Sequence, residues 1–312
     1  MMTKEFVRKT DRPGYTEDIS GIRILNERFF DNEDGSRIRY LTFPIFEKLD
    51  MMDHVLATRE GGVSTGCYSS MNLSFTMGDD PDHVSENLDR MMRILGTDKS
   101  RIVTADQKHT ANVRIAAAQD AGKGITKERD YSEVDGNITN VRGLVLAVYA
   151  SDCVPLYFAD PVRRAIGAVH SGWRGTVQRI GAVTVKKMSE TYGTDPADLI
   201  CAAGPSICRS CYEIGAEVAE EFMKEFPGHE DEILTDDGMR DVTDPKTGEV
   251  KSEHKYHLDL WQANRIVLEE AGVRPENIQI TDICTCCNPG LLFSHRISGR
   301  KRGNNAGFIM LR

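Results

Sequence analysis

Apolar runs of strand length, separated by polar turns, predict the strands at the centre of this chain. Three such runs follow one another closely, and their near-continuous apolar character is typical of buried strands. We expect these three strands to be adjacent, and we expect two further strands near the C-terminal end. The predicted ranges are 144–149, 154–158, 165–169, 278–283 and 307–311.

The first 50 residues predict an entry region of short strands. Alternating runs at 21–25 and 37–41 flank the turn-rich stretch 31–35, which is the pattern of a hairpin. We assign residues 1–50 to the same domain as residues 51–312, which carry the motifs described below.

Four helices are predicted from apolar residues that recur at intervals of three and four. Their ranges are 84–95, 176–192, 215–226 and 258–271, and glycines stop the first two at Gly96 and Gly193. The second helix follows the turn Gly172-Trp173-Arg174-Gly175. Its N-terminus is expected to point back at the strand ends, where the partly positive amides can meet an anion.

Two stretches lack periodicity. Residues 120–135 predict a solvated loop, with a lid over a site as the alternative. Residues 228–256 are acidic and turn-rich and contain the hairpin candidate 245–248, so they predict a surface insertion.

Because strands and helices do not alternate cleanly, the pattern favours an α+β, mixed-sheet architecture. The absence of Gly-x-Gly-x-x-Gly and Gly-x4-Gly-Lys-Ser/Thr motifs argues against a Rossmann cofactor or a P-loop.

Composition and charge narrow the function further. The 312 residues are 40% hydrophobic and 28% charged, and 39 Lys plus Arg against 48 Asp plus Glu give a net charge of −9. This charge disfavours general attraction to nucleic acid or to an anionic membrane. The N-terminal residues lack the apolar core of a signal peptide, and no run is long enough for a transmembrane helix. We therefore expect a cytoplasmic protein with reduced cysteines.

Candidate chemistry is concentrated at three strand or turn ends, which carry His109, Cys153 and His170. One thiolate and two imidazoles are a normal ligand set for zinc with a fourth, open position, which is the catalytic pattern. Taken singly, each of these residues is as compatible with a buried thiol or a hydrogen-bonded histidine. The glycines after His170 strengthen the hypothesis because they let the backbone approach a ligand beside Arg174.

Two other patterns carry weaker signals. The turn Thr58 to Gly66 pairs Arg59 with glycines and hydroxyls, and it predicts either an anion site or an ordinary β-turn with a solvated arginine. Two Cys-x2-Cys pairs lie more than 70 residues apart. They predict either a four-thiolate zinc site or packed free thiols, and the residues are Cys208, Cys211, Cys284 and Cys287.

Ordered motifs from Val55 to the C-terminus resemble the YfiH family, which is also called the laccase-domain or multicopper polyphenol oxidase family and is related to the peptidoglycan-editing factors. The segments that carry the resemblance include Thr58-Arg59-Glu60-Gly61-Gly62-Val63-Ser64, Asn72-Leu73, Gln107 with His109, Asp135-Gly136, Asp152-Cys153-Val154-Pro155, the 170–175 run, Gly204-Pro205-Ser206-Ile207, Cys211-Tyr212-Glu213 and Phe293-Ser294-His295-Arg296. The resemblance implies a single α/β domain with layered mixed sheets, shared with certain cysteine-dependent toxin domains.

The resemblance also implies an activity and a site. The resemblance implies phosphate-dependent cleavage of purine nucleosides such as adenosine, inosine and guanosine. Methylthioadenosine cleavage and adenosine deamination are also associated with the family. The implied metal and catalytic residues are His109, Cys153 and His170, with zinc favoured over copper. The substrate-binding residues that we expect are Arg59, Ser64, Asn72 and Arg174, and the candidate proton shuttles are Asp152 and Glu213. We expect a monomer or a small homo-oligomer.

Some positions depart from the family pattern, and two alternative functions stay open. Lys108, Thr110 and Ser151 stand where other residues are usual, and the cysteine-dense stretch around Cys286 is also unusual. The first alternative is a copper-dependent phenol oxidase, although such oxidases take many ligands from His-x-His pairs and this chain has eight histidines and no such pair. The second alternative is a cysteine amidase of peptidoglycan editing, with Cys153 as nucleophile and His170 as base.

Overall fold

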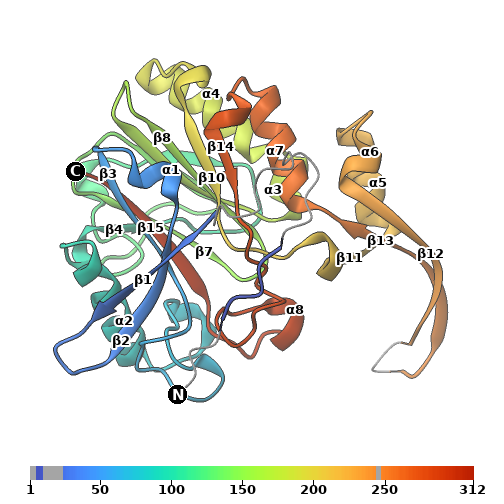
Figure 1. Ribbon diagram of the computed structural model, residues 1–312, viewed down its shortest axis with the longest axis horizontal. Helices are drawn as coiled ribbons and strands as arrows, with labels where there is room; N and C mark the ends of the chain where they lie inside the picture. Colours follow the sequence, from blue (N-terminus) through green and yellow to red (C-terminus); the bar gives the residue numbers. More distant parts are fainter. Residues whose placement is uncertain (1–4, 10–23, 244–246) are drawn as a thin grey trace.

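Two six-stranded mixed sheets pack face to face at the centre of the computed structural model, which describes residues 5–9, 24–243 and 247–312 (Figure 1). The first sheet contains, in spatial order, β1 (Asn26–Asp31), β2 (Arg37–Thr42), β3 (Met52–Ala57), β15 (Asn305–Leu311), β7 (Val145–Ala150) and β4 (Ile102–Thr104). The second contains β14 (Ile278–Ile280), β10 (Ile200–Ala203), β8 (Val154–Asp160), β9 (Ala165–Ser171), β6 (Gly136–Thr139) and β5 (Val113–Ile115).

The alternation of side chains along β8 explains how one strand serves two layers. Leu156 and Phe158 belong to the core cluster under the helices, whereas Tyr157 and Ala159 belong to the cluster between the two sheets. Successive side chains of a strand point to opposite faces, so a strand that is apolar throughout is buried on both sides. The predicted burial of this strand is confirmed.

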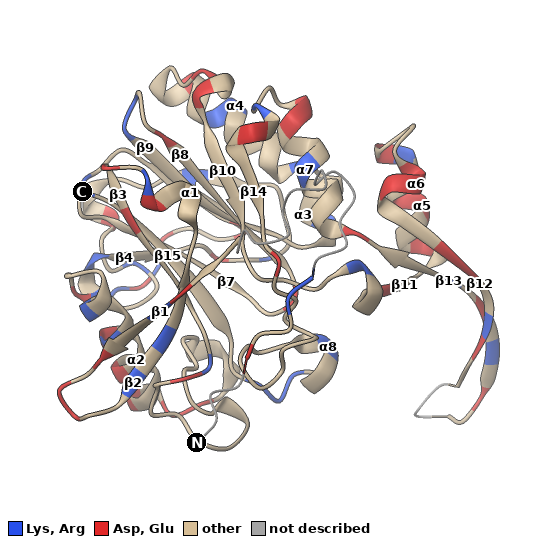
Figure 2. Ribbon diagram, viewed as in Figure 1, with Lys and Arg blue, Asp and Glu red and all other residues tan. Residues whose placement is uncertain are grey.

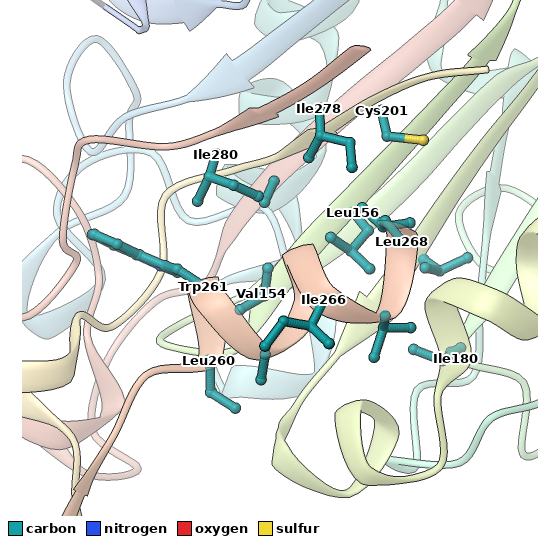
Figure 3. Packing of buried hydrophobic residues seen from close by; sticks show 14 of the residues in the cluster. Val154, Leu156, Ile180, Cys201, Leu260, Trp261, Ile266, Leu268, Ile278 and Ile280 are labelled. Atoms are coloured by element: carbon teal, nitrogen blue, oxygen red, sulfur yellow. The ribbon is translucent and has the colours of Figure 1, made fainter. Parts of the chain in front are cut away.

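Helices cover the outer faces and complete four layers. Asp80 precedes helix α2 (Pro81–Ile94) and caps it with its side chain, and the apolar side of the helix packs on the first sheet. Helices α4 (Ile180–Tyr192) and α7 (Leu260–Glu270) cover the second sheet, where Leu268 lies close to Leu156 (Figure 3). The predicted mixed α/β architecture is therefore confirmed. Two short helices, α1 (Pro44–Glu47) and α8 (His295–Ser298), lie in connecting segments.

Three predictions about elements need correction. The first hairpin strand is β1 at Asn26–Asp31, whereas the predicted range 21–25 lies partly outside the described residues and its last two residues precede the strand. Strand β7 is not next to β8. It pairs with β15 and β4 in the other sheet, and the chain crosses between the sheets at residues 151–153. Periodicity alone could not reveal this crossover, because both strands are equally apolar.

The predicted helix 176–192 is two helices. Helix α3 (Trp173–Val177) ends at Gln178, and Arg179 adopts a left-handed conformation with φ of 56° before α4 begins. The Arg179 guanidinium is held by the carboxylates of Glu225 and Glu270. These ion pairs stabilise the break between the two helices, which the hydrophobic periodicity of the sequence does not reveal.

A projecting arm forms the third sheet, with the order β11 (Glu213–Gly215), β13 (Val250–Leu258) and β12 (Leu234–Thr243). It extends away from the two main sheets in Figure 1, as expected for a surface insertion. The hairpin candidate 245–248 lies partly outside the described residues. Acidic residues are frequent along the adjoining helices α5 (Ala216–Glu225) and α6 (Glu230–Ile233), which are coloured red over much of their length in Figure 2. Across the described ranges, no helix is both long and apolar enough to cross a membrane.

Candidate active site

His109, Cys153 and His170 come together from three different connections. Cys153 lies in the crossover between β7 and β8, His170 is near the end of β9, and His109 is in the loop between β4 and β5. The thiol sulfur and one nitrogen of each imidazole all lie within 4.8 Å of one another. His170 is buried, Cys153 is half-buried and His109 is exposed. The structure thus brings together the three residues that the sequence singled out.

Unusual backbone conformations place two of these side chains. His109 has φ of 63°, and Asp152, immediately before Cys153, has φ of 90°. Non-glycine residues rarely adopt such angles, and they persist where surrounding contacts over-determine them. Gly172 completes the arrangement, because a Cβ there would lie 2.7 Å from Cδ2 of His109 and 3.1 Å from Sγ of Cys153. The predicted close approach of backbone after His170 is therefore a packing requirement of the site.

Asp135 organises the loop that carries His109. Its carboxylate accepts hydrogen bonds from the backbone N–H groups of Lys108, His109 and Thr110, at 2.8–3.0 Å. One oxygen of the same carboxylate also lies 2.8 Å from Nδ1 of His170. Since Nδ1 of His170 is engaged, Nε2 is left to face the Cys153 thiol. Such a carboxylate partner fixes the tautomer and the orientation of a histidine ligand.

Charges within the cluster move three pKa values. Burial opposes ionisation of Cys153, but the His170 charge and a hydrogen bond with His109 lower the pKa of Cys153 to about 6. Burial disfavours the His170 cation, yet the Cys153 thiolate and the Asp135 carboxylate raise the pKa of His170 to about 9. Against its burial, hydrogen bonds from His170 and the Thr110 amide lower the pKa of Asp135 to about 2. The protein therefore favours a thiolate at Cys153 near neutral pH.

This donor set fits a metal ion. One thiolate and two imidazoles within 4.8 Å of one another are the number and kind of protein ligands found in catalytic zinc sites, which keep a fourth position open. The orienting contact from Asp135 is a further feature of metal-bound histidines. A site that binds a metal here is consistent with both the sequence and the geometry.

The cluster opens into a cavity of about 640 Å³. Its lining combines aromatic side chains, such as Trp173, Tyr149 and Tyr212, with polar groups near the cluster. A cavity of this volume is in the ordinary range for small-molecule sites. The loop predicted at 120–135 forms part of its wall through Gly124 and Arg129, so this loop borders the cavity.

Arg302 is one of three arginines that line this cavity. Its Nε is buried and has no hydrogen-bond partner among the described residues, while Nη1 donates to the Gly303 carbonyl at 2.9 Å. Burial lowers the pKa of Arg302, and the neighbouring negative groups Asp152 and Cys153 act in the opposite direction. The other guanidinium groups in the cavity, those of Arg129 and Arg296, donate to backbone carbonyls. Arg302 therefore places a positive charge at the cavity, and the described protein around it leaves its buried Nε without a partner.

None of the four residues expected to bind substrate, Arg59, Ser64, Asn72 and Arg174, is among the residues that line this cavity. Arg59 donates to the carbonyls of Ser69 and Pro289 and stacks on Phe293, with 4.3 Å from its guanidinium carbon to the ring centroid. It lines a separate cavity. The glycine turn around Arg59 thus forms part of the scaffold beside the site, and these contacts give no support for the predicted substrate role.

Ser64 and Asn72 are buried, and their side chains share one hydrogen-bond partner. The Ser64 hydroxyl donates to Asp79 at 2.6 Å, and the Asn72 amide donates to the same carboxylate at 3.0 Å. Asn72 also accepts from the backbone N–H of Asn304, a residue that does line the cavity. Both side chains support the cavity wall from behind. Arg174 is exposed, and its guanidinium stacks on the ring of Trp173 at 4.1 Å.

The two candidate proton shuttles occupy different places. The Asp152 carboxylate lines the cavity, but it accepts from Thr285 Oγ1 at 2.5 Å, Ser294 Oγ at 3.1 Å and the Arg296 amide at 2.6 Å. This carboxylate is thus saturated with donors and positions the loop. Glu213 is on β11, where its carboxylate contacts Arg240, and it is not among the residues that line the cavity.

Sequence reasoning missed Arg302 and the role of Asp135. Arg302 belongs to the basic run 300–302, which is flanked by glycines just before the last strand, and this was the available signal. Asp135 was noted as part of a motif, but its pairing with a histidine 35 positions later required the β6–β9 pairing to be known.

Comparisons with known proteins show which family this chain is similar to. A family model described as multi-copper polyphenol oxidoreductase laccase matches residues 53–312. A Bacillus subtilis (strain 168) protein named purine nucleoside phosphorylase YlmD is 33% identical over 256 residues, which cover 81% of this chain and 86% of that protein. A protein from an unknown prokaryotic organism, named adenosine deaminase RL5, is 34% identical over 269 residues, 84% of this chain and 95% of that protein.

A solved structure is similar throughout. The crystal structure titled Bacillus licheniformis hypothetical protein YfiH matches with a TM-score of 0.76 and 30% identity, covering 88% of this chain and 96% of that chain. The resemblance to YfiH proteins that the motifs predicted is thereby confirmed. By its sequence from residue 53 onward and by its fold, this chain belongs to the multi-copper polyphenol oxidoreductase laccase family.

Proposed function

We propose that this chain is a zinc-dependent purine nucleoside phosphorylase, acting on nucleosides such as adenosine, inosine and guanosine. The observation that carries the proposal is the joint position of His109, Cys153 and His170 at a cavity of about 640 Å³ that Arg302 also lines. A relative named purine nucleoside phosphorylase that shares 33% identity supports the same reaction. Methylthioadenosine is a further candidate substrate.

The reaction needs an anion site beside the reacting carbon. A phosphate oxygen attacks C1′ of the ribose, the bond from C1′ to the purine nitrogen breaks, and the base leaves with the electron pair and takes up a proton. Arg302 is placed to hold the phosphate by charge-assisted hydrogen bonds. Trp173 and Tyr212 supply ring surfaces on which a planar purine can pack. Closing the cavity around the substrate would keep water from capturing the ribosyl cation-like transition state.

Zinc fits the donor set better than copper does, because one thiolate and two imidazoles with a fourth open position are a common zinc arrangement. When bound, zinc would supply a Lewis acid that stabilises negative charge on an oxygen in the cavity. The contribution of the chain is to keep Cys153 as a thiolate and to orient His170 through Asp135.

Adenosine deamination is a second activity of the same cavity in this proposal. In that reaction an oxygen from water replaces the amino group at C6 of adenine, and ammonia leaves. A relative named adenosine deaminase, 34% identical over most of both chains, supports it. No further binding site is needed, because the base and the cluster share one cavity.

One observation favours a different reaction, that of a cysteine hydrolase. Without a metal, Cys153, His170 and Asp135 resemble the nucleophile, base and orienting carboxylate of such enzymes, and the pKa of the Cys153 thiol is lowered to about 6 by its neighbours against its burial. The two functions differ in their response to reagents. A thiol nucleophile is blocked by iodoacetamide and is indifferent to chelators, whereas the proposed phosphorylase loses activity when its metal is removed.

The deciding assay follows free base and ribose 1-phosphate by chromatography, from adenosine and inosine, with and without phosphate. The variants are Cys153→Ala and the matched control Cys67→Ala, which removes an exposed thiol that does not line the cavity. We expect phosphate-dependent release of base from the wild type and the control, and none from Cys153→Ala. Retained turnover in Cys153→Ala would overturn the role of the cluster.

A further inference from the structure

A second cluster of candidate metal ligands, made of four cysteines, lies behind the wall of the cavity. Cys208 and Cys211 lie in the loop between β10 and β11, and Cys284 and Cys287 lie in the loop after β14. All four sulfurs are within 4.8 Å of one another, although the two pairs are separated by 76 residues in the chain. This is the second cluster of candidate metal ligands in the described residues, and the proposed reaction makes no use of it.

The geometry is that of a tetrahedral thiolate site. Four sulfurs at about 2.3 Å from a central zinc ion would be about 3.8 Å apart. Cys211 Sγ and Cys287 Sγ are 3.5 Å apart, too far for a disulfide bond of about 2.05 Å. The remaining separations stay below 4.8 Å, so only small side-chain adjustments are needed for all four sulfurs to reach one ion.

The surroundings are suited to negative charge on sulfur. The backbone N–H groups of Cys208 and Cys287 both donate to Sγ of Cys284, at 3.3 and 3.4 Å. Lys9 donates to the hydroxyl of Ser210 at 3.3 Å, which places its ammonium group next to the cluster and in contact with Cys287. Four thiolates around a divalent ion carry a net charge of −2, which nearby N–H groups and a cation stabilise.

We propose that Cys208, Cys211, Cys284 and Cys287 bind a structural zinc ion, distinct from the cluster of His109, Cys153 and His170. Two Cys-x2-Cys pairs provide the four ligands of a closed site, which leaves no position for substrate. On binding, the thiols release their protons to solvent and the ion keeps its oxidation state. The long separation in sequence, which argues against a compact zinc ribbon, is bridged here by the parallel contact between Ser206 and Cys284.

Such an ion would join the two loops that carry one side of the active-site cavity. The first loop contributes Ile207 and Tyr212 to the lining, and the second leads into His295 and Arg296. The same second loop donates to the Asp152 carboxylate through Thr285 at 2.5 Å. The zinc ion would therefore stabilise the crossover segment that carries Cys153. It would do so from behind the cavity wall, without contacting substrate.

The test is zinc content per chain, measured by mass spectrometry after zinc-replete expression, in a Cys153→Ser background that disables the other cluster. We expect one zinc ion per chain in this background and its loss in Cys208→Ser/Cys211→Ser added to it. The matched control is Cys286→Ser, which removes a thiol from the same turn but not from the group of four, and which should keep the ion. Zinc that persists in the double-serine variant, or zinc absent from the background, would overturn the proposal.

A measurement on the intact chain covers the case in which the serine variant fails to fold. Metal-free wild-type protein is titrated with Co²⁺, whose absorption distinguishes a site with four thiolates from one with a single thiolate. We expect intense thiolate-to-cobalt charge-transfer bands and low-energy d–d bands typical of tetrahedral four-sulfur coordination. A spectrum with single-thiolate intensity at saturation would contradict the site. Because this readout does not depend on turnover, it can fail independently of the proposed phosphorylase.

Discussion

The carboxylate of Asp135 lies 2.8 Å from Nδ1 of His170 and, through its amide contacts, also fixes the loop that carries His109. One buried carboxylate thus positions both imidazoles of the cluster. We predict that Asp135→Asn lowers metal affinity by roughly 10–100-fold and lowers turnover with it, because both oxygens of Asp135 face N–H groups and the NH2 of the new amide cannot accept from them. Metal content after dialysis against a graded chelator series measures this effect.

The control for Asp135→Asn is Thr110→Val. It removes one hydroxyl donor to Asp135 at 2.9 Å while the backbone N–H of residue 110 stays in place. We expect its metal affinity to stay near that of the wild type. Equal losses in both variants would indicate that general loop damage, rather than orientation of His170, explains the effect.

Arg302 is predicted to act on phosphate rather than on the nucleoside. Its charged side chain lines the cavity, so a phosphate bound there would gain a charge-assisted contact. We expect Arg302→Ala to raise KM for phosphate about tenfold or more, with little change in KM for inosine. The matched control is Arg300→Ala in the same basic run, which does not line the cavity. A larger effect on inosine than on phosphate would contradict the assignment.

Arg59 is predicted to act on stability. It ties together the carbonyls of Ser69 and Pro289 and covers the Phe293 ring. We expect Arg59→Ala to lower the free energy of unfolding by about 1–3 kcal/mol and to leave KM for both substrates unchanged at temperatures where the variant is folded. Urea unfolding and steady-state kinetics on the same preparation test both halves. An increase in KM without loss of stability would restore its predicted role in substrate binding.

His54 gives the fold a pH dependence that is separate from catalysis. Burial lowers the pKa of His54 to about 4, and its Nε2 accepts a hydrogen bond from the Phe43 amide at 2.7 Å. The unfolded chain, with an ordinary histidine pKa near 6.5, binds more protons than the folded chain between about pH 4 and pH 6.5. Stability therefore falls as the pH drops through this window, by about 2–3 kcal/mol in total.

The variant His54→Gln keeps an acceptor for the Phe43 amide and removes the titration. We predict that its free energy of unfolding changes less than that of the wild type between about pH 6.5 and pH 4. Denaturant unfolding at a series of pH values gives the comparison. Parallel curves for the two proteins would show that His54 does not titrate as its burial requires.

Local signals made the members of the cluster candidates, and the ordered motifs that resemble the YfiH family joined them into one set. Cys153 and His170 flank apolar strands, and the glycines after His170 mark a close backbone approach. The crossover of the chain between the two sheets was not predictable in the same way. It depends on the pairing of β7 with β15, a strand about 160 residues later, and a run of apolar residues fits either sheet equally well.

Residues with the same local pattern took different roles for reasons that lie outside the local sequence. Arg59 and Arg302 both lie within two residues of a glycine. The partners of Arg59 come from residues 69 and 289, whereas Arg302 lines the cavity. The four-thiolate cluster presents the same problem. Its spacing in sequence argued against a shared site, and the contact between residues 206 and 284 supplied the missing proximity.

The central claim, that this cluster and cavity perform phosphorolysis, is tested most directly by ³¹P NMR of inosine and phosphate with the zinc-loaded protein. The account predicts one ribose 1-phosphate formed and one phosphate consumed for each hypoxanthine released, and no such signal with Cys153→Ala. Release of hypoxanthine and free ribose without consumption of phosphate, or no release of base by protein with zinc bound at the cluster, would contradict it.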